Sequence, residues 1–352
     1  MNHFKTESLK EFTARLKELS GRRTDMLIRQ NDLKPADDGT LWCKHGAISP
    51  GSWMHSQLAD KLRPTAQWDR RYYDNMLRQA PKLWAESMST WLGRGEAAKE
   101  NRLIRAYRIG NSKEEFEGRA FLSDSMRIFG YDDILFAGMD ALNSIRSEVA
   151  VKELTLTDTK MWVRFEHQGR SFKVGGSDYT GGLEIGESEV GNGAAFAWPY
   201  LQRTSCKNSR VLVGKHGFRQ VHLGKTLTEA FLLSDETRRK ENELVMMKFK
   251  DVCRGVLAAE NFQKLIDLVQ QAHEERVETP LKSLEQLVQE PMIGEARRER
   301  LLEQWSKEGF TRLGLSEAVS AIAQREPELG DRRELEVFAG RVLDRDYKLA
   351  AA

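Results

Sequence analysis

Apolar and polar residues alternate through residues 148–174, and this pattern predicts β-strands. Apolar side chains recur with mostly two-residue spacing in two runs: Val149, Val151, Leu154 and Leu156, and then Met161, Val163 and Phe165. Successive side chains of a strand point to opposite faces, so this period is typical of a half-buried antiparallel sheet. Short turns at 157–159 and 167–170 would then divide the segment into a three-stranded meander.

Helical spacing of apolar residues predicts helices on both sides of this meander. Before it, helices are expected near 4–19, 68–91 and 132–145, and after it a long helix is expected over 227–257. The remainder of the chain then reads as shorter helices to the end. The expected fold class is α+β, with an antiparallel β-meander packed with helices and a helical C-terminal region. Three regions follow: a mainly helical 1–100, an α+β core at 101–259, and a helical 260–352.

The passage at 174–193 is studded with glycines: Gly175, Gly176, Gly181, Gly182, Gly186, Gly191 and Gly193. They do not form a phosphate loop, because no Gly-Lys-Ser/Thr follows at the required spacing and no dinucleotide fingerprint opens a helix. The expectation is a mobile loop whose glycines permit bulges and tight turns.

A local excess of positive charge follows the glycines. Residues 190–228, called the basic strip below, contain no Asp or Glu but carry six cationic side chains: Arg203, Lys207, Arg210, Lys215, Arg219 and Lys225. The strip also contains aromatic residues, among them Trp198 and Tyr200. Lys and Arg neutralise phosphates, and unpaired bases stack on aromatic rings, so this combination favours a site for single-stranded nucleic acid.

Residues of the meander extend this candidate site. Arg164, Arg170 and Lys173, together with the cations of the basic strip, are expected to line one groove, with Trp198 and Tyr200 as stacking candidates. The alternative is a solvated sheet face whose arginines pair with Glu184, Glu187, Glu189 and the next helix. In that case at least one of the two aromatic residues belongs to the core.

The three glutamates at 184–189 raise a further alternative, a divalent cation in a nuclease-like arrangement. No Asp followed by Glu-x-Lys supports this, and solvated loop charges account for the same residues. We therefore expect a protein that needs neither a metal nor ATP as cofactor.

Composition limits the remaining classes. The chain has 352 residues, 40% of them apolar and 31% charged, as in ordinary globular proteins. Its formal charge of +2 means that a polyanion must be met by a local patch. Three scattered cysteines fit a reducing compartment, and no apolar run is long enough to span a bilayer, so the expected location is the cytoplasm.

Several segments resemble one family. They read Arg-Ala-Phe-Leu-Ser-Asp at 119–124, Leu-Thr-Leu-Thr-Asp-Thr-Lys-Met-Trp-Val-Arg at 154–164, Ser-Glu-Val-Gly-Asn-Gly at 188–193, Pro-Tyr-Leu-Gln-Arg-Thr-Ser-Cys-Lys-Asn at 199–208 and Thr-Arg-Leu-Gly-Leu-Ser-Glu-Ala-Val at 311–319. Together they resemble the phage/plasmid-like proteins grouped as domain of unknown function 932, over roughly residues 70–345. Where a Cys-x-Asn-Gly sequence is expected, this chain has Ser209 in place of the glycine. The resemblance implies a mobile-element protein and brings no established chemistry.

The order of the expected elements suggests a second resemblance. A helix, a three-stranded meander, a glycine-broken basic stretch and a long helix are similar to the single-strand annealing recombinases of phages and eukaryotes. That resemblance implies a homo-oligomer that binds single-stranded DNA and anneals strands, with a host or phage replication or recombination protein as a possible partner. The competing class is a non-enzymatic protein-interaction or anti-defence factor of a mobile element.

Overall fold

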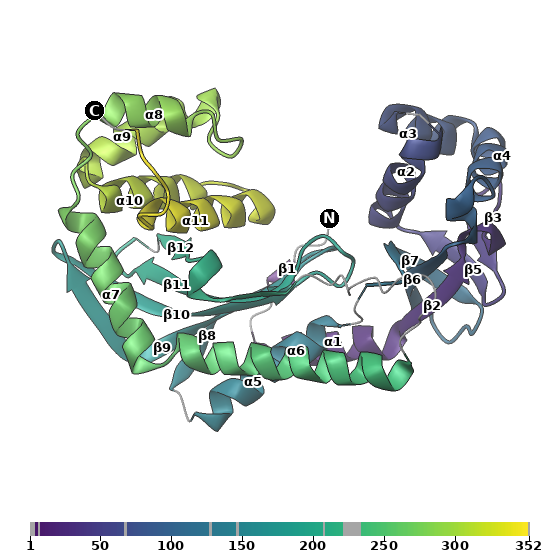
Figure 1. Ribbon diagram of the computed structural model, residues 1–352, viewed down its shortest axis with the longest axis horizontal. Coiled ribbons are helices and arrows are strands. Elements are labelled where there is room, and N and C mark those ends of the chain that lie inside the picture. Colours follow the sequence, from purple (N-terminus) through teal and green to yellow (C-terminus); the bar gives the residue numbers. More distant parts are fainter. Residues whose placement is uncertain are drawn as a thin grey trace.

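The computed structural model describes residues 4–5, 8–66, 69–126, 129–145, 148–206, 208–220 and 234–350. Within them the strands form two sheets, and the two sheets occupy different parts of the molecule (Figure 1). Helices α2–α4 stand at one end of the molecule and the C-terminal helices at the other, with the second sheet curling between them. This arrangement confirms the expected fold class, an α+β protein with a helical C-terminal region.

The first sheet is built mainly from N-terminal residues. In the described residues its order is β2-β6-β7-β5-β4-β3, with β5 parallel to β7 and the other pairs antiparallel. The strands are β2 (Arg23–Arg29), β3 (Lys34–Pro35), β4 (Leu41–Cys43), β5 (Gly46–Pro50), β6 (Asn101–Arg108) and β7 (Glu115–Ser123). Helices α2 (Ser52–Ala66), α3 (Arg70–Gln79) and α4 (Pro81–Leu92) share a core with it. Because β2 pairs with β6, the boundary expected at residue 100 falls within this sheet.

The second sheet contains the expected meander. Its path through the described residues is β1-β8-β9-β10-β11-β12, and β13 also pairs with β11. The strands are β1 (Phe4–Lys5), β8 (Val149–Leu156), β9 (Met161–Val174), β10 (Ser177–Glu187), β11 (Ala195–Arg203), β12 (Ser209–Val211) and β13 (Phe218–Gln220). The turn expected at 167–170 does not exist, because β9 runs through it as one strand. The third strand of the meander is β10, which the glycine-rich passage forms.

The glycines of β10 are needed for close packing within the sheet. A Cβ on Gly182 would lie 2.0 Å from the carbonyl oxygen of Phe165, and one on Gly186 would lie 2.5 Å from the ring of Phe196. The ladder between β9 and β10 also shifts register between Thr180 and Gly182, as at a β-bulge. The expectation of a loop at 174–193 is therefore wrong for its central part. Glycines with positive φ lie in the connections at either side of β10, at 175–176 and 191–193.

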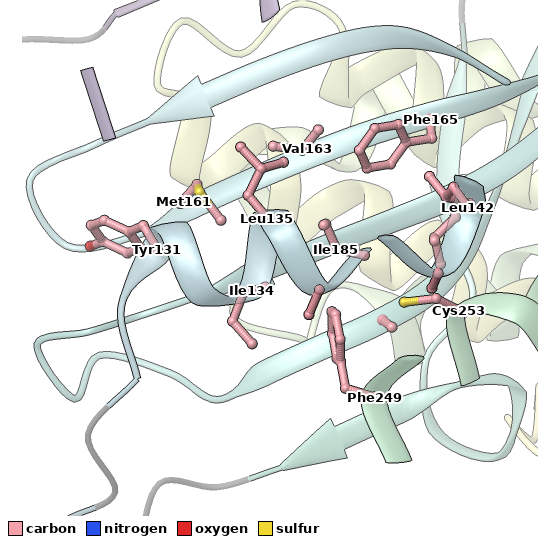
Figure 2. Packing of buried hydrophobic residues seen from close by; sticks show 14 of the residues in the cluster. Tyr131, Ile134, Leu135, Leu142, Met161, Val163, Phe165, Ile185, Phe249 and Cys253 are labelled. Atoms are coloured by element: carbon pink, nitrogen blue, oxygen red, sulfur yellow. The ribbon is translucent and has the colours of Figure 1, made fainter. Parts of the chain in front are cut away.

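One face of the second sheet carries the main hydrophobic core. Helices α1 (Leu9–Arg22), α5 (Tyr131–Ser144) and α6 (Asp235–Val256) contribute to this core, and Figure 2 shows α5 side chains such as Leu135 against Val163 and Ile185. The inward side chains of the strands alternate, as period-two patterning requires. A long helix was expected over 227–257; α6 begins at Asp235, and residues 227–233 lie outside the described residues. The hydroxyl of Ser234 caps α6 by accepting a hydrogen bond from the amide of Thr237.

The C-terminal helices form their own core and also contact the second sheet. They are α7 (Ala259–Glu274), α8 (Pro280–Leu287), α9 (Arg298–Glu308), α10 (Arg312–Ala323) and α11 (Leu329–Leu343). Trp305 and Phe338 are fully buried in their core. Gly340 of α11 lies so close to β12 that a Cβ there would be 2.0 Å from the carbonyl oxygen of Val211. The helical region is therefore packed directly against the edge of the sheet.

Candidate nucleic-acid interface

The face of the second sheet opposite its hydrophobic core carries charged and aromatic side chains. Alternation along β9, β10 and β11 brings Trp162 and Arg164, Glu184, and Phe196, Trp198 and Tyr200 onto this face. Helix α11 contacts the same face through Arg333 and Glu336. Most residues of the expected groove thus meet the C-terminal helices.

Arg164 is buried in a network of glutamates. Its Nε donates to Glu184 Oε2 at 2.6 Å and its Nη1 to Glu153 at 3.1 Å, while its Nη2 donates to Glu336 of α11. Burial opposes the charge, but Glu336 and the other two carboxylates hold the pKa of Arg164 well above its ordinary value. With 2% of its surface exposed, Arg164 is not available to a phosphate.

Arg210 likewise forms an ion pair inside the protein. It is fully buried and donates to Glu317 of α10, whose carboxylate also accepts from the Tyr179 hydroxyl at 2.9 Å. Removal of a buried ion-pair partner is costly, because the remaining charge is then uncompensated. Arg210 therefore joins the sheet to the C-terminal helices.

More exposed cations of the basic strip follow the same pattern. Arg203 donates to Glu308 at 2.6 Å, and Lys215 donates to Asp346 at 2.7 Å and to Asp344 at 3.2 Å. All these acidic partners lie more than 100 residues further along the chain. The acidic partners of the basic strip therefore come from the C-terminal region.

The remaining candidates are scattered. Arg170 donates to the carbonyl of Leu257 and lies over Phe262, and Lys173 is 76% exposed near Asp178 at the far end of β9. Tyr200 is fully buried, whereas Trp198 is half-buried and Arg219 exposed. Lys207 and Lys225 lie outside the described residues. The expectation of one groove lined by all these side chains is wrong.

The alternative of a solvated sheet face is wrong, because Glu184, Glu187 and Glu189 are all buried, although the expected pairing of an arginine with one of them is present between Arg164 and Glu184. Glu184 pairs with Arg164 and Arg333, and Glu189 lies 3.7 Å from Arg23 and accepts from the Tyr107 hydroxyl. No group of three residues able to hold a metal occurs in the part of the chain that the structure describes.

Trp198 and Arg219 border a cavity of about 280 Å³ between the sheet and α11. Its wall is largely apolar and aromatic, formed by Met161, Trp162, Phe196, Trp198, Met292 and Val337. Its charged lining consists of Lys160, Arg219, Arg333 and Arg341, with Glu187 and Glu334 as the acids. We call this the aromatic cavity.

The rings of Phe196 and Trp198 form a stacked pair at the aromatic cavity. Their centroids are 4.5 Å apart with an interplanar angle of 18°, since residues two apart on β11 share a face. Arg333 lies over both rings, at 5.3 Å from Phe196 and 5.7 Å from Trp198. Gly217 leaves room for the indole, because a Cβ there would be 2.5 Å from Trp198 Cδ1.

Burial shifts the pKa of two charged side chains that line the aromatic cavity. Burial raises the pKa of Glu187 well above its usual value, with the neighbouring Glu189 adding to the effect, which opposes a negative charge at this residue. Burial lowers the pKa of the Arg333 guanidinium, and its partner Glu184 opposes this. The indole Nε1 of Trp198 has no hydrogen-bond acceptor among the described residues.

Sequence reasoning missed the residues that α11 brings to the aromatic cavity. Arg333 and Arg341 lie on a helix with charge on most turns, a pattern shared by any solvated helix. No signal in the sequence around Trp198 reveals that Arg333 and Arg341 line the same cavity.

Comparison of the chain with protein-family models, with curated proteins and with solved structures finds no match. Among the described helices, none combines the length and the apolar character needed to cross a bilayer.

Proposed function

We propose that the protein binds single-stranded DNA at the aromatic cavity and promotes the annealing of complementary strands. The observation that carries this proposal is the stacked Phe196–Trp198 pair beside several cationic side chains. Aromatic rings in a positively charged groove are the means by which proteins bind unpaired bases without sequence preference.

The chemistry of the cavity favours a single strand over a duplex. An unpaired base offers its π-face to an apolar, aromatic wall, whereas a base inside a duplex is already stacked on its neighbours. Arg219, which is exposed, and Arg341, which is 41% exposed, are suited to the flanking phosphates. Arg341 lies 3.9 Å from Glu290, so that contact is long enough to yield to a phosphate.

Fluorescence anisotropy of a labelled single-stranded oligonucleotide, with a duplex of the same sequence alongside, tests the proposal. We expect salt-sensitive binding that favours the single strand. Arg219→Gln should weaken binding and lower the log–log salt slope by about 0.7 for the lost phosphate contact. Lys173→Gln is the matched control, because it removes the same charge from an exposed position at the other end of β9. Equal effects of the two variants, or no binding at low salt, would refute the site.

Trp198→Phe separates stacking from charge. It keeps an aromatic ring and leaves the charged lining unchanged, so the salt slope should stay constant while affinity falls modestly. Trp198→Ala should lower affinity further, and its melting temperature must be followed because truncating a packed Trp costs about 3–5 kcal/mol. A Trp198→Ala protein that binds like the parent would remove the stacking role.

Annealing and self-association extend the proposal. Annealing by a homo-oligomer would require subunits to hold one strand together, and the exposed side chains of Leu244 and Met247 on α6 offer an apolar contact for another subunit. A fluorescence annealing assay without ATP or metal, together with light scattering with and without DNA, measures both properties. A role in a phage, plasmid or integrated element is proposed on the motif resemblance alone.

The second candidate is a protein-interaction factor of a mobile element, and the same two α6 side chains favour it. They are 47% and 56% exposed and lie three residues apart, on one face of α6. A monomer that binds no DNA but loses a partner on Leu244→Ser would favour this candidate over annealing.

A further inference from the structure

A second cavity lies at the junction of the two sheets. Its volume is about 330 Å³, and it lies between α1, β6, β7, the start of α5 and the turn after β8. Its polar lining is dominated by Arg15, Arg22, Arg119, Tyr107 and Tyr131. We call it the junction cavity. Three guanidinium groups from two separate elements thus meet around two phenol rings.

Two buried donors at the junction cavity lack acceptors. The hydroxyl of Tyr131 has no hydrogen-bond partner in the described part of the chain, although the residue is only 3% exposed. The same holds for Nε of Arg119. Buried polar atoms are nearly always hydrogen-bonded, so two orphaned donors on residues that line one cavity indicate a missing acceptor. Burial raises the pKa of Tyr131 well above its ordinary value, which keeps its hydroxyl protonated as a donor.

The contacts that hold the arginines in place use only some of their N–H donors. Arg119 donates through Nη2 to the carbonyl of Asp158 and lies 5.3 Å from the centre of the Tyr107 ring. Arg22 donates through Nε to the carbonyl of Arg108 and lies 6.0 Å from the same ring. A guanidinium carries five N–H donors, so each contact leaves capacity for an oxyanion.

Acidic groups also border the junction cavity. The Glu117 carboxylate lies 3.9 Å from Arg119 Nη1, beyond hydrogen-bond distance, and is 47% exposed. Glu18 is outside the lining and lies 3.9 Å from Arg22. Asp158 is exposed, and it contacts Arg119 through its backbone carbonyl. These carboxylates reduce the positive potential of the junction cavity, but they form no hydrogen bond to Arg22 or Arg119.

We propose that the junction cavity binds the phosphate group of a phosphorylated ligand, with Arg119 and the Tyr131 hydroxyl as its buried donors and Arg22 at its more exposed side. A tetrahedral oxyanion with several acceptor oxygens matches donors that approach from α1, β7 and α5. The site is independent of the proposed function. However, Thr157 and Asp158 border this cavity while Lys160 borders the aromatic cavity, so one turn adjoins both. The phosphate belongs either to a small ligand or to a DNA backbone.

Calorimetric titration and thermal shift with inorganic phosphate, a mononucleotide and a single-stranded oligonucleotide test the site. We expect phosphate or the mononucleotide to raise the melting temperature of the full-length protein. Arg119→Gln should weaken that binding roughly tenfold or more, since it removes a charged hydrogen-bond donor. Glu117→Gln should strengthen phosphate binding, because it removes a negative charge beside Arg119. Its expected effect is opposite in sign to that of Arg119→Gln.

Tyr131→Phe is the decisive variant, because it removes only the orphaned hydroxyl. It should weaken phosphate binding several-fold, whereas the unliganded protein should melt no lower than the parent. Arg22→Gln provides a more exposed position if Arg119→Gln does not fold. Arg219→Gln should leave phosphate binding unchanged, because Arg219 lines the aromatic cavity and not the junction cavity. The two proposals can therefore fail independently.

The three ligands distinguish the source of the phosphate. Binding of phosphate or the mononucleotide with the expected dependence on Tyr131 and Arg119 assigns a small ligand. Binding of the oligonucleotide alone, with the same dependence, assigns the phosphate to a DNA backbone. No response to any of the three, or responses that Tyr131→Phe and Arg119→Gln leave unchanged, would overturn the proposal.

Discussion

Replacing Glu317 by Gln tests whether the basic strip serves to dock the C-terminal helices. Arg210 and Glu317 are exposed by 0% and 2%, so Glu317→Gln would leave a guanidinium charge buried without its partner. The amide retains an acceptor for the Tyr179 hydroxyl, but its amino group replaces the oxygen that accepts from Asn208 Nδ2 at 3.2 Å, so the change removes a charge and one hydrogen bond. Breaking a buried pair in this way costs about 3–5 kcal/mol.

Urea unfolding followed by tryptophan fluorescence measures this cost, because Trp305 is buried among the C-terminal helices. The double variant Arg210→Met/Glu317→Gln removes both charges and should be less destabilised than the sum of the two single variants. Arg203→Gln is the control, since Arg203 and Glu308 are 21% and 25% exposed and such a pair contributes about 0–1 kcal/mol. A cost below about 1 kcal/mol for Glu317→Gln would refute the docking role.

Two further predictions follow from buried titratable groups. Because the folded-state pKa of Glu187 is raised, its ionisation opposes folding as pH rises above the ordinary carboxyl value, so Glu187→Gln should stabilise the protein at pH 7 and lose that advantage on acidification. Thermal melts across that pH range measure it, and a variant that is less stable at pH 7 would contradict the reasoning. Burial raises the pKa of Cys253 to about 12, so exposed Cys206 should react much faster than Cys253 with a thiol reagent in the native protein, and half-buried Cys43 should react at an intermediate rate. Rapid modification of Cys253 before unfolding, seen by mass spectrometry, would show that it is accessible.

Local patterning was sufficient to predict the fold class. The alternation of β8 and β9 and the helical spacing of α5 reflect which face each element buries, and that information lies within a few residues. The third strand was missed because β10 contains glycines, which usually weaken strands. Here Gly182 and Gly186 are required by the close approach of Phe165 and Phe196, and those neighbours come from other strands.

The candidate site was predicted less well because charge pairing is not local. The absence of acids from the basic strip does indicate that its cations find partners elsewhere. Those partners, Glu308, Glu317 and Asp344, lie more than 100 residues away in the sequence, so a local pattern does not identify them. Trp198 and Arg219 were identified from composition, and the structure brings them together at one cavity. Only the packing of α11 against the sheet brings Arg333 to the same place.

Photocrosslinking tests the proposed DNA site most directly. A single-stranded oligonucleotide carrying 5-iodouracil would be bound to the native protein and irradiated, and the crosslinked peptide identified by mass spectrometry. If bases enter the aromatic cavity, crosslinks should fall on Phe196 or Trp198, and excess unlabelled single strand should abolish them while duplex should not. Crosslinks confined to other segments, or equally strong crosslinks to a duplex, would contradict the account.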